Sequence, residues 1–332
     1  MMRHGGDYAN GLRHWIGSII LVCNELRPRR PRRASVPMTE PGTWRFLRRR
    51  LPCAVAAAGM SLAIAHAGAL RVVAAENFYG DVAQQIGGAD VTVESVLRNP
   101  ATDPHLFEAS PSVARAFASA RIVIYNGIGY DPWAESLLAA AARPDRTAIV
   151  VARLAGKAAG DNPHIWYDPA TMPALAQALA KVLAADDPAH RAGYQARLAR
   201  FLASMQPINR EIAALRGRLA GTPVTATEPV FGYLLEALGL EVRNRPFQLA
   251  VMNDTEPSAA EMAAFEDDLR GRRVRLLVYN SQASGPVAER MVRIAKAAGI
   301  PVLAVTETEP PGATYQSWLL REIGAVGRAL RK

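Results

Sequence analysis

The chain has 332 residues, half of them hydrophobic and 21% charged, a composition that suits a globular protein of two lobes or domains. The formal net charge is +9, yet residues 1–67 hold eleven of the 39 basic residues and only three of the 30 acidic ones. The remaining chain is therefore almost neutral. Because the basicity belongs to the leader, a nucleic-acid partner loses its main support, and we predict none.

The first 67 residues have the pattern of a leader that directs export. Residues 45–50 are rich in arginine, residues 51–64 are apolar, and Ala65-His66-Ala67 matches the small-x-small cleavage pattern of a signal peptide. The apolar run has fourteen residues and is shorter than the roughly 20 that cross a membrane. We therefore predict a periplasmic protein cleaved near Ala67. Because export signals start near the first residue, Met38 is a plausible true start.

Both cysteines, Cys23 and Cys53, lie in this leader. Cys53 precedes most of the apolar run, which is the wrong position for a lipoprotein cysteine. The mature chain is therefore expected to contain no disulfide, no soft thiolate metal ligand and no cysteine nucleophile.

After the leader, short β-branched runs alternate with helical segments, which predicts parallel sheets covered by helices. In the first half, strands are expected at 70–75, 91–96, 121–125 and 148–151, with helices around 82–86 and over 110–120. Helices are then expected at 170–184 and, with apolar residues at helical spacing, at 189–219. In the second half, strands are expected at 223–227, 241–243, 274–279 and 302–305, and helices at 230–238, 258–269, 286–298 and 315–330.

This order predicts an α/β protein with two Rossmann-like lobes of mostly parallel strands, joined by one long helix. The expected boundaries are a leader at 1–67, an N-terminal lobe at 68–187, the linking helix at 188–219 and a C-terminal lobe at 220–332. A helix of about 30 residues spans roughly 45 Å, which is long enough to run along both lobes. Ligands of open parallel sheets collect beyond the C-terminal ends of the strands, so a single cleft between the lobes is the expected site.

Histidine is scarce in the mature chain, and two of its three histidines share a context. His105 follows Asp103-Pro104 and His164 follows Asn162-Pro163, and each precedes an aromatic-rich step. Proline fixes the backbone beside the imidazole and holds it on a stiff loop. The matched settings favour metal ligation, whereas His190 at the start of a helix is interpreted as a surface residue.

Carboxylates at the ends of strands in the second lobe could complete such a site. Glu228 follows the strand at 223–227, and Glu307 and Glu309 follow the strand at 302–305. Each acid taken alone is more often an N-cap or a first-turn helix charge. Their placement at corresponding edges favours the cleft.

Several segments of the mature chain resemble a known family. They are 103–108 (DPHLFE), 126–133 (NGIGYDPW), 163–169 (PHIWYDP), 227–233 (TEPVFGY) and 315–318 (YQSW). With these segments, the chain from about Leu70 to Leu330 resembles the metal-binding receptors of zinc/manganese ABC importers, the solute-binding proteins of cluster A-I type. The resemblance implies two α/β lobes joined by a long rigid helix, with the ion between them.

The resemblance also implies a ligand set. His105 and His164 match the two histidine ligands of the N-terminal lobe. Glu228 stands where zinc-type members have a third histidine and manganese-type members a glutamate. Glu307 stands where the family usually has an aspartate, and with Glu309 nearby the fourth ligand stays open. Candidates for orienting the imidazoles are Glu108, Asp168, Asn77 and Asn280.

The expected cargo is one divalent transition-metal ion, Mn²⁺ or Zn²⁺, with Fe²⁺ as a further option. A shell of two histidines and two glutamates is rich in oxygen and favours Mn²⁺ and Fe²⁺, although Zn²⁺ binds such sites at least as tightly in vitro. The expected partner is an ABC permease in the inner membrane, and the protein is expected to be a monomer without enzymatic activity.

Three alternative functions remain open from the sequence. A periplasmic metal-dependent hydrolase would use the same ligands and leave one position for water. A receptor for an organic solute would use a similar two-lobed scaffold with an aromatic-lined pocket. An adhesin or structural surface protein would need no particular ligand set.

Overall fold

The computed structural model describes residues 69–101, 103–253, 255–283 and 285–331. These belong to one compact unit, Ala65–Lys332. The predicted leader and its cleavage near Ala67 lie outside the described residues, as do both cysteines. Within the described part of the chain, no helix combines the length and apolarity that a membrane span requires.

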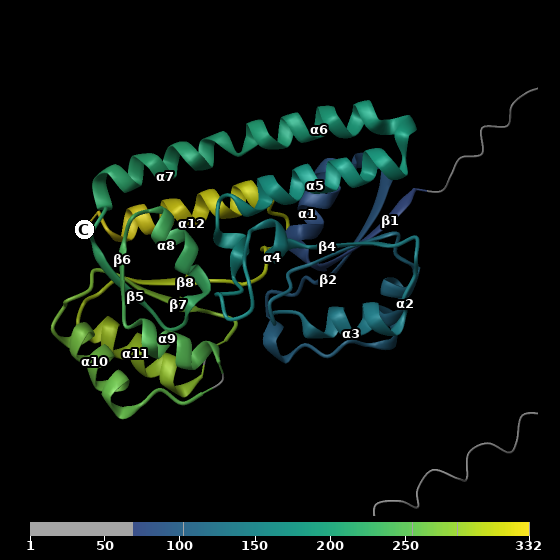
Figure 1. The fold of residues 1–332 in the computed structure, drawn as a ribbon. Helices are drawn as coiled ribbons and strands as arrows, with labels where there is room; N and C mark the ends of the chain where they lie inside the picture. Colours follow the sequence, from purple (N-terminus) through teal and green to yellow (C-terminus); the bar gives the residue numbers. More distant parts are fainter. Residues whose placement is uncertain (1–68, 102, 254, 284, 332) are drawn as a thin grey trace, which may run out of the picture. The chain divides into compact units, whose positions relative to one another are not determined.

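The N-terminal lobe is built on a four-stranded parallel sheet in the order β2-β1-β3-β4 (Figure 1). Its strands are β1 (Leu70–Glu76), β2 (Val91–Leu97), β3 (Ile122–Tyr125) and β4 (Thr147–Val150). Its helices are α1 (Asn77–Gly87), α2 (Pro111–Ser119), α3 (Pro132–Ala140), α4 (Val151–Leu154) and α5 (Thr171–Asp186). Strand β3 is buried along its whole length, as expected for a parallel strand covered on both faces.

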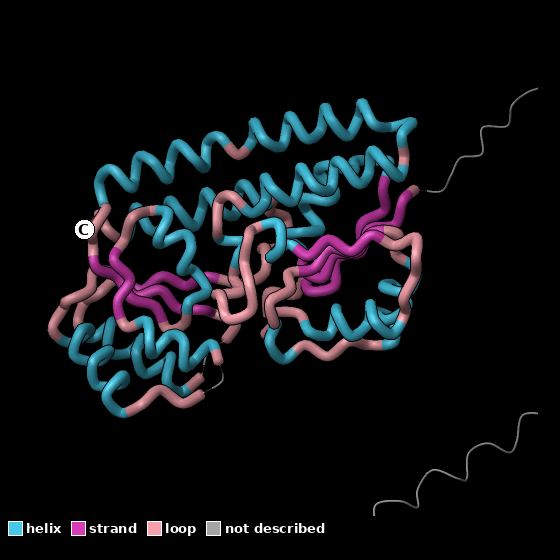
Figure 2. Tube along the Cα trace, viewed as in Figure 1, coloured by secondary structure: helices cyan, strands magenta, loops and turns pink. Residues whose placement is uncertain are grey.

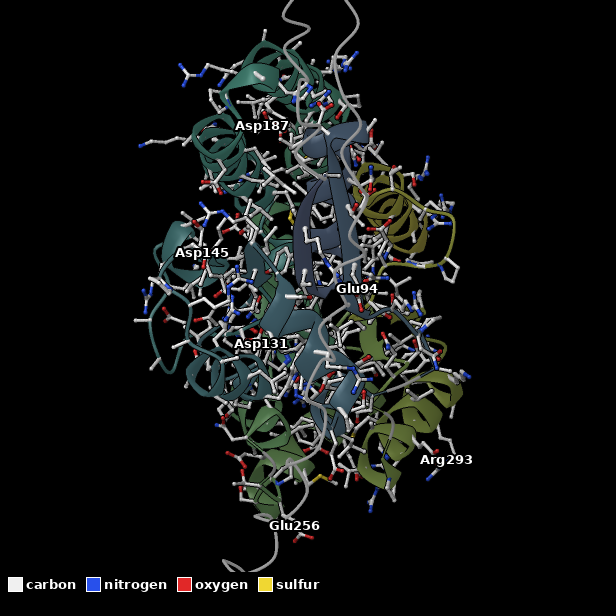
Figure 3. The ribbon with its side chains drawn as sticks, turned by 90° about the vertical axis from the view of Figure 1, so that its right-hand side faces the viewer. Glu94, Asp131, Asp145, Asp187, Glu256 and Arg293 are labelled. Atoms are coloured by element: carbon white, nitrogen blue, oxygen red, sulfur yellow. The ribbon has the colours of Figure 1, made fainter. Side chains whose placement is uncertain are left out.

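The C-terminal lobe repeats this arrangement with the order β6-β5-β7-β8, again all parallel. Its strands are β5 (Pro223–Ala226), β6 (Glu241–Arg243), β7 (Leu277–Asn280) and β8 (Val302–Val305). Its helices are α8 (Gly232–Ala237), α9 (Arg245–Met252), α10 (Ala259–Arg270), α11 (Pro286–Ala297) and α12 (Tyr315–Ala329). The two sheets form separate groups in Figure 2, and Glu256 and Arg293 lie at the outer edge of this lobe in Figure 3.

The connection predicted as one long helix consists of two, α6 (Arg191–Ser204) and α7 (Gln206–Leu219), preceded by a 3₁₀ turn at Pro188–His190. They are separated at Met205 and continue along nearly one line in Figure 1. Pro207 in the first turn of α7 explains the break. It has no N–H to donate, and its ring disfavours a continuous helix through this position.

The α/β class, the parallel sheets and the two lobes are confirmed, and every predicted strand is present. The sequence analysis missed three short helices: α3, α4 and α9. Strand β7 starts at Leu277 rather than at the predicted 274, and the helix expected at 230–238 is a 3₁₀ turn followed by the six-residue α8. Short elements carry too few residues for a periodicity to be distinguished.

A shared aromatic core joins the lobes beneath their facing strand ends. Trp166 is fully buried and stacks on Phe78, with ring centroids 4.8 Å apart. Tyr167 meets Phe231 of the C-terminal lobe edge-on at 4.7 Å, and the Tyr315 hydroxyl donates to the Trp166 carbonyl oxygen at 2.7 Å. Because these side chains pack as one cluster, the loops above them are held in a fixed relation.

Candidate metal centre

His105 lies on a 3₁₀ turn, Pro104–Leu106, in the loop between β2 and α2. The Asp103 carboxylate accepts a hydrogen bond from the His105 backbone N–H at 2.9 Å and so caps the turn. Pro104 stands at its first position, where the missing N–H costs nothing. The His105 side chain is one-third exposed and reaches the opposite lobe, where Nε2 lies 3.4 Å from Oε1 of Glu307.

His164 lies in the loop that follows α4 and is fully buried. Asn162 Oδ1 accepts from the His164 backbone N–H at 3.1 Å and contacts Nδ1 at 2.6 Å. The imidazole rests edge-on against Trp166, with centroids 5.2 Å apart. Nε2 has no hydrogen-bond partner and lies 3.7 Å from Oε2 of Glu307.

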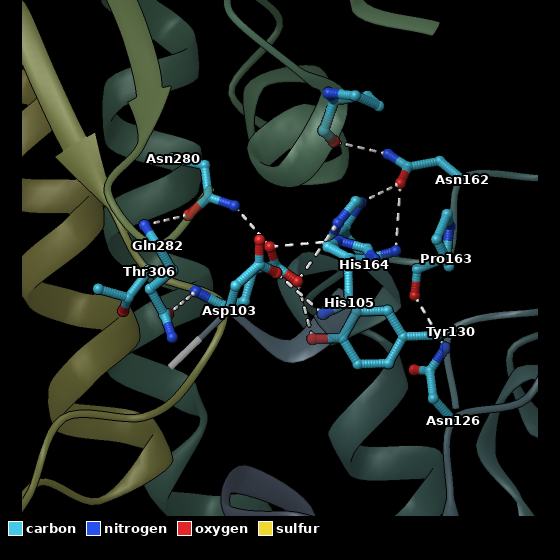
Figure 4. Close-up of polar contacts among 12 residues, drawn as sticks. Asp103, His105, Asn126, Tyr130, Asn162, Pro163, His164, Asn280, Gln282 and Thr306 are labelled. Carbon is cyan, nitrogen blue, oxygen red and sulfur yellow. Dashed lines mark hydrogen bonds and ion pairs between the residues drawn. The ribbon is translucent and has the colours of Figure 1, made fainter. Parts of the chain in front are cut away.

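Glu307 comes from the loop after β8 and is also fully buried. Gln282 Oε1 holds this loop by accepting from the backbone N–H groups of Glu307 (2.6 Å) and Thr308 (3.0 Å). The carboxylate accepts from the Tyr130 hydroxyl at 2.8 Å and from the Asn280 side-chain amide. It therefore lies between the two histidines and two neutral donors, Tyr130 and Asn280, and these four neighbours are labelled in Figure 4.

One ligand atom from each of His105, His164 and Glu307 lies within 4.8 Å of the other two. Transition-metal ions hold nitrogen and oxygen ligands at about 2.0–2.2 Å, so ligand atoms around one ion are separated by roughly 3–4 Å. The three groups need only a small contraction to reach that geometry. Three of the four predicted ligands, from both lobes, thus lie together.

Glu228 lies two residues after the end of β5 and is 5% exposed. It interacts electrostatically with Glu307 and His105, but it is not one of the three residues whose ligand atoms lie within 4.8 Å of one another. It occupies the N-cap position of the 3₁₀ turn Pro229–Phe231 without making a capping hydrogen bond. Asn280 is within hydrogen-bonding reach of its carboxyl group, while Oε1 is buried without a partner. A plain capping role therefore does not explain Glu228.

Glu309 takes a different position from Glu307. Its backbone N–H and C=O both pair with the side chain of Asn77, and its Oε2 is buried without a partner. It does not belong to the group formed by the two histidines and Glu307. Of the two acids after β8, the structure brings Glu307 to the histidines.

Burial and neighbouring charges shift the pKa values of all four predicted ligands from their ordinary values. Interaction with the Glu307 carboxylate raises the pKa of His105 to about 9 against the opposing effect of burial. Burial lowers the pKa of His164 to about 4. Burial, together with the charge of Glu307, raises the pKa of Glu228 to about 8. Burial also acts to raise the pKa of Glu307, but the two histidines and Tyr130 outweigh it and lower the value.

Two residues that shape the site, Tyr130 and Asn162, were not among the predicted site residues. Tyr130 is 4% exposed and belongs to a loop with three consecutive positive φ angles at residues 127–129, which turns its hydroxyl towards Glu307. Asn162 contacts His164, and its place two residues before the histidine, where an Asx turn is common, was a signal that could have identified it.

The residues proposed to orient the imidazoles act elsewhere. Asn280 holds the Glu307 carboxylate, and Asn77 holds the backbone of Glu309. Asp168 accepts from the Ala170 backbone N–H just before α5. Within the described part of the chain, no hydrogen bond or ion pair joins Glu108 to either histidine.

The chain is similar to several known proteins. Residues 72–329 match the family described as zinc-uptake complex component A, periplasmic. The chain is 22% identical over 285 residues to the manganese ABC transporter substrate-binding lipoprotein PsaA of Streptococcus pneumoniae, covering 79% of this chain and 89% of the relative. It is 20% identical over 284 residues to the iron ABC transporter substrate-binding lipoprotein MtsA of Streptococcus pyogenes serotype M1, with the same coverage.

Among solved structures, the periplasmic zinc-binding protein TroA of Treponema pallidum superimposes with a TM-score of 0.67 at 18% identity. The match covers 79% of this chain and 99% of TroA. At this identity the match shows the fold. Since the family match spans nearly all of the described residues, the chain belongs to the family of periplasmic zinc-uptake complex components, the solute-binding proteins of metal importers. The class expected from the sequence is confirmed.

Proposed function

We propose that this chain captures one divalent transition-metal ion between its lobes and delivers it to an ABC permease in the inner membrane. The ligands are His105, His164, Glu228 and Glu307. The observation that carries this proposal is the meeting of two histidines and a carboxylate, from both lobes, within 4.8 Å. The unpartnered, buried Nε2 of His164 supports it, because buried polar atoms without partners are rare unless a ligand satisfies them.

The cargo follows from the donor set. Two imidazole nitrogens and up to four carboxylate oxygens favour Mn²⁺ and Fe²⁺ more than a three-histidine shell does, while the Irving–Williams order keeps Zn²⁺ a strong competitor in vitro. The named relatives carry manganese, iron and zinc in their descriptions and support this range of ions. In the cell, metal availability decides between them. The protein acts as a monomer that catalyses no reaction, and its leader is removed near Ala67.

The test is to remove bound metal from the mature protein with a chelator and then to measure the binding of Mn²⁺, Zn²⁺ and Fe²⁺ by titration calorimetry and by thermal melting. An ion at 100 times its Kd adds about 2.7 kcal/mol of stability. If none of these ions raises the melting temperature, the proposal is contradicted.

His105→Ala and His164→Ala should each weaken binding at least about tenfold, because each removes a direct ligand. His190→Ala is the matched control, since His190 is more than half exposed and pairs with Asp187 away from the site. Sustained hydrolysis by the metal-loaded protein that disappears in His105→Ala would favour the metal-dependent hydrolase instead.

A further inference from the structure

Asn162 makes contacts on both sides of the cleft. On one side, its Oδ1 accepts from the backbone N–H of His164 and contacts Nδ1 of the same residue. On the other, its Nδ2 donates to the Pro229 carbonyl oxygen of the C-terminal lobe at 2.7 Å. Pro229 directly follows Glu228. One amide group, labelled together with His164 in Figure 4, thus joins the loop of a histidine ligand to the loop of a glutamate ligand.

The amide orientation is determined by both neighbours. A backbone N–H can only donate, so the atom facing it is Oδ1, and a carbonyl oxygen can only accept, so the atom facing Pro229 is Nδ2. Because Oδ1 can only accept, Nδ1 of His164 must carry the proton that it donates in this contact. This leaves Nε2 as the unprotonated nitrogen, and Nε2 is the atom that faces Glu307 without a hydrogen-bond partner. Asn162 selects the tautomer that can bind a metal ion.

The contact with the C-terminal lobe is reinforced around Asn162. The Tyr233 hydroxyl donates to the Asn162 backbone carbonyl at 2.8 Å, and the Lys157 ammonium lies 4.3 Å from the centre of the Tyr233 ring. Gly232 leaves room for the amide, since a Cβ there would come within 3.2 Å of Asn162 Nδ2. Several independent contacts therefore place the Asn162 loop against the start of α8.

We propose that Asn162 is a positioning residue that couples the orientation of His164 to the contact between the two lobes at Pro229, and so sets the rate at which the ion leaves. This inference rests on the proposed function. An aspartate would orient a histidine ligand at least as well, through a charged acceptor. The Asn162 amide both accepts from His164 and donates to Pro229, whereas an ionised carboxylate can only accept.

The decisive variant is therefore Asn162→Asp. It keeps an acceptor for Nδ1 of His164 but places a second oxygen against the Pro229 carbonyl oxygen. If Asn162 only oriented the histidine, this variant would hold the ion as well as the wild type. With the coupling we propose, the ion leaves about tenfold faster, the lower end of the range for residues that support a metal ligand. Asn209→Asp is the control, because it makes the same charge change at an exposed position of α7.

Tyr233→Phe provides a second variant that leaves His164 and Asn162 side-chain contacts intact. It removes one hydrogen bond between the lobes, and we expect ion release to be several-fold faster. Release is measured by loading each protein with Zn²⁺ alone and mixing it with an excess of a chromophoric chelator. Circular dichroism and thermal melts of the ion-free proteins show whether each variant is folded.

Imidazole ¹⁵N chemical shifts of the ion-free protein report the tautomer directly. We expect the proton of His164 on Nδ1 in the wild type and in Tyr233→Phe, and loss of that fixed tautomer in Asn162→Ala. A general structural defect would lower the melting temperature without changing the tautomer.

Faster release from Asn162→Asp and Tyr233→Phe, with Asn209→Asp unchanged, supports the inference. The inference is overturned if Asn162→Asp releases the ion at the same rate as Asn209→Asp. If Asn162→Asp does not fold, the inference is overturned when Tyr233→Phe releases the ion at the wild-type rate. If the wild type binds Zn²⁺ and every variant releases it at the same rate, the proposed function stands and only the inference is overturned. A wild type that binds no ion removes both.

Discussion

The Tyr130 hydroxyl donates to Oε2 of Glu307 at 2.8 Å, and this hydrogen bond joins the loop after β3 to the loop after β8 across the cleft. Tyr130 is 4% exposed, so the bond is shielded from water and directed at a charged acceptor. Hydrogen bonds to charged groups contribute about 1.5–3 kcal/mol. The bond fixes which Glu307 lone pairs remain for a metal ion.

Replacing this tyrosine should therefore weaken metal binding without unfolding the protein. Tyr130→Phe keeps the ring and removes only the hydroxyl, and we expect about a tenfold rise in Kd, as is usual when a group supporting a ligand is lost. Tyr194→Phe is the control because its hydroxyl also donates to a carboxylate, that of Asp187, but away from the site. Titration calorimetry compares the two, and equal affinities would show that the bond does not position Glu307.

The two acids after β8 should respond very differently to the same chemical change. Glu307→Gln removes a carboxylate that contacts both histidines, and we expect metal affinity to fall by at least about a hundredfold. Burial raises the pKa of Glu309 to about 9, so this side chain is neutral at pH 7 and Glu309→Gln should leave affinity within about twofold. Competition with a chelating dye measures both. The reverse order would make Glu309 the ligand.

The sequence predicted the fold well because its signals are local. The strand at 70–75 and the proline turns before His105 and His164 can be recognised from neighbouring residues. The choice between Glu307 and Glu309 could not be made from neighbouring residues, because both follow the same strand. It depends on Gln282 and Asn77, which hold successive parts of that loop from 25 and 232 residues away.

The same limit applies to the residues that connect the lobes. Asn162 and Pro229 are 67 positions apart, and nothing in their own segments indicates that they pair. An ordinary histidine pKa of about 6.5 would place the loss of metal binding near pH 6. The structure moves that range upward, because the carboxylate of Glu307 favours the protonated form of His105.

Metal uptake at pH 7 should accordingly release protons. His105, with a pKa raised to about 9, and Glu228, with a pKa raised to about 8, are both protonated at pH 7 in the ion-free protein. Each must lose its proton to bind a metal ion. His164, with a pKa lowered to about 4, is already neutral. We therefore expect release of close to two protons per ion, and an affinity that rises with pH up to about 9.

Calorimetry in buffers of different ionisation enthalpy counts these protons. In His105→Ala the count should fall by about one, whereas His190→Ala should leave it unchanged. An affinity that is constant from pH 6 to pH 8.5, or no proton release at pH 7, is incompatible with these ligands in the protonation states described.

Glu228→Gln should affect stability and binding in opposite directions. Burial is the main reason that the folded-state pKa of Glu228 is raised to about 8, above its ordinary value of 4.5. The folded state therefore holds this proton more tightly than the unfolded state, and the contribution of Glu228 to stability falls as pH rises from about 4.5 to 8. Glutamine does not titrate. The ion-free variant should thus be more stable than the wild type at pH 8.5, by at least about 2 °C in Tm, and the difference should shrink near pH 5.

With metal present, the wild type should become the more stable of the two proteins, because glutamine offers a neutral oxygen donor that is weaker than a carboxylate. The metal-induced rise in Tm at pH 8.5 should be smaller in Glu228→Gln than in the wild type. Glu241→Gln, at an exposed position of β6, serves as the control and should change neither quantity. A variant that loses stability in the ion-free form as well would indicate a structural role. A gain without metal together with a loss with metal is expected only of a buried carboxylate that binds the ion.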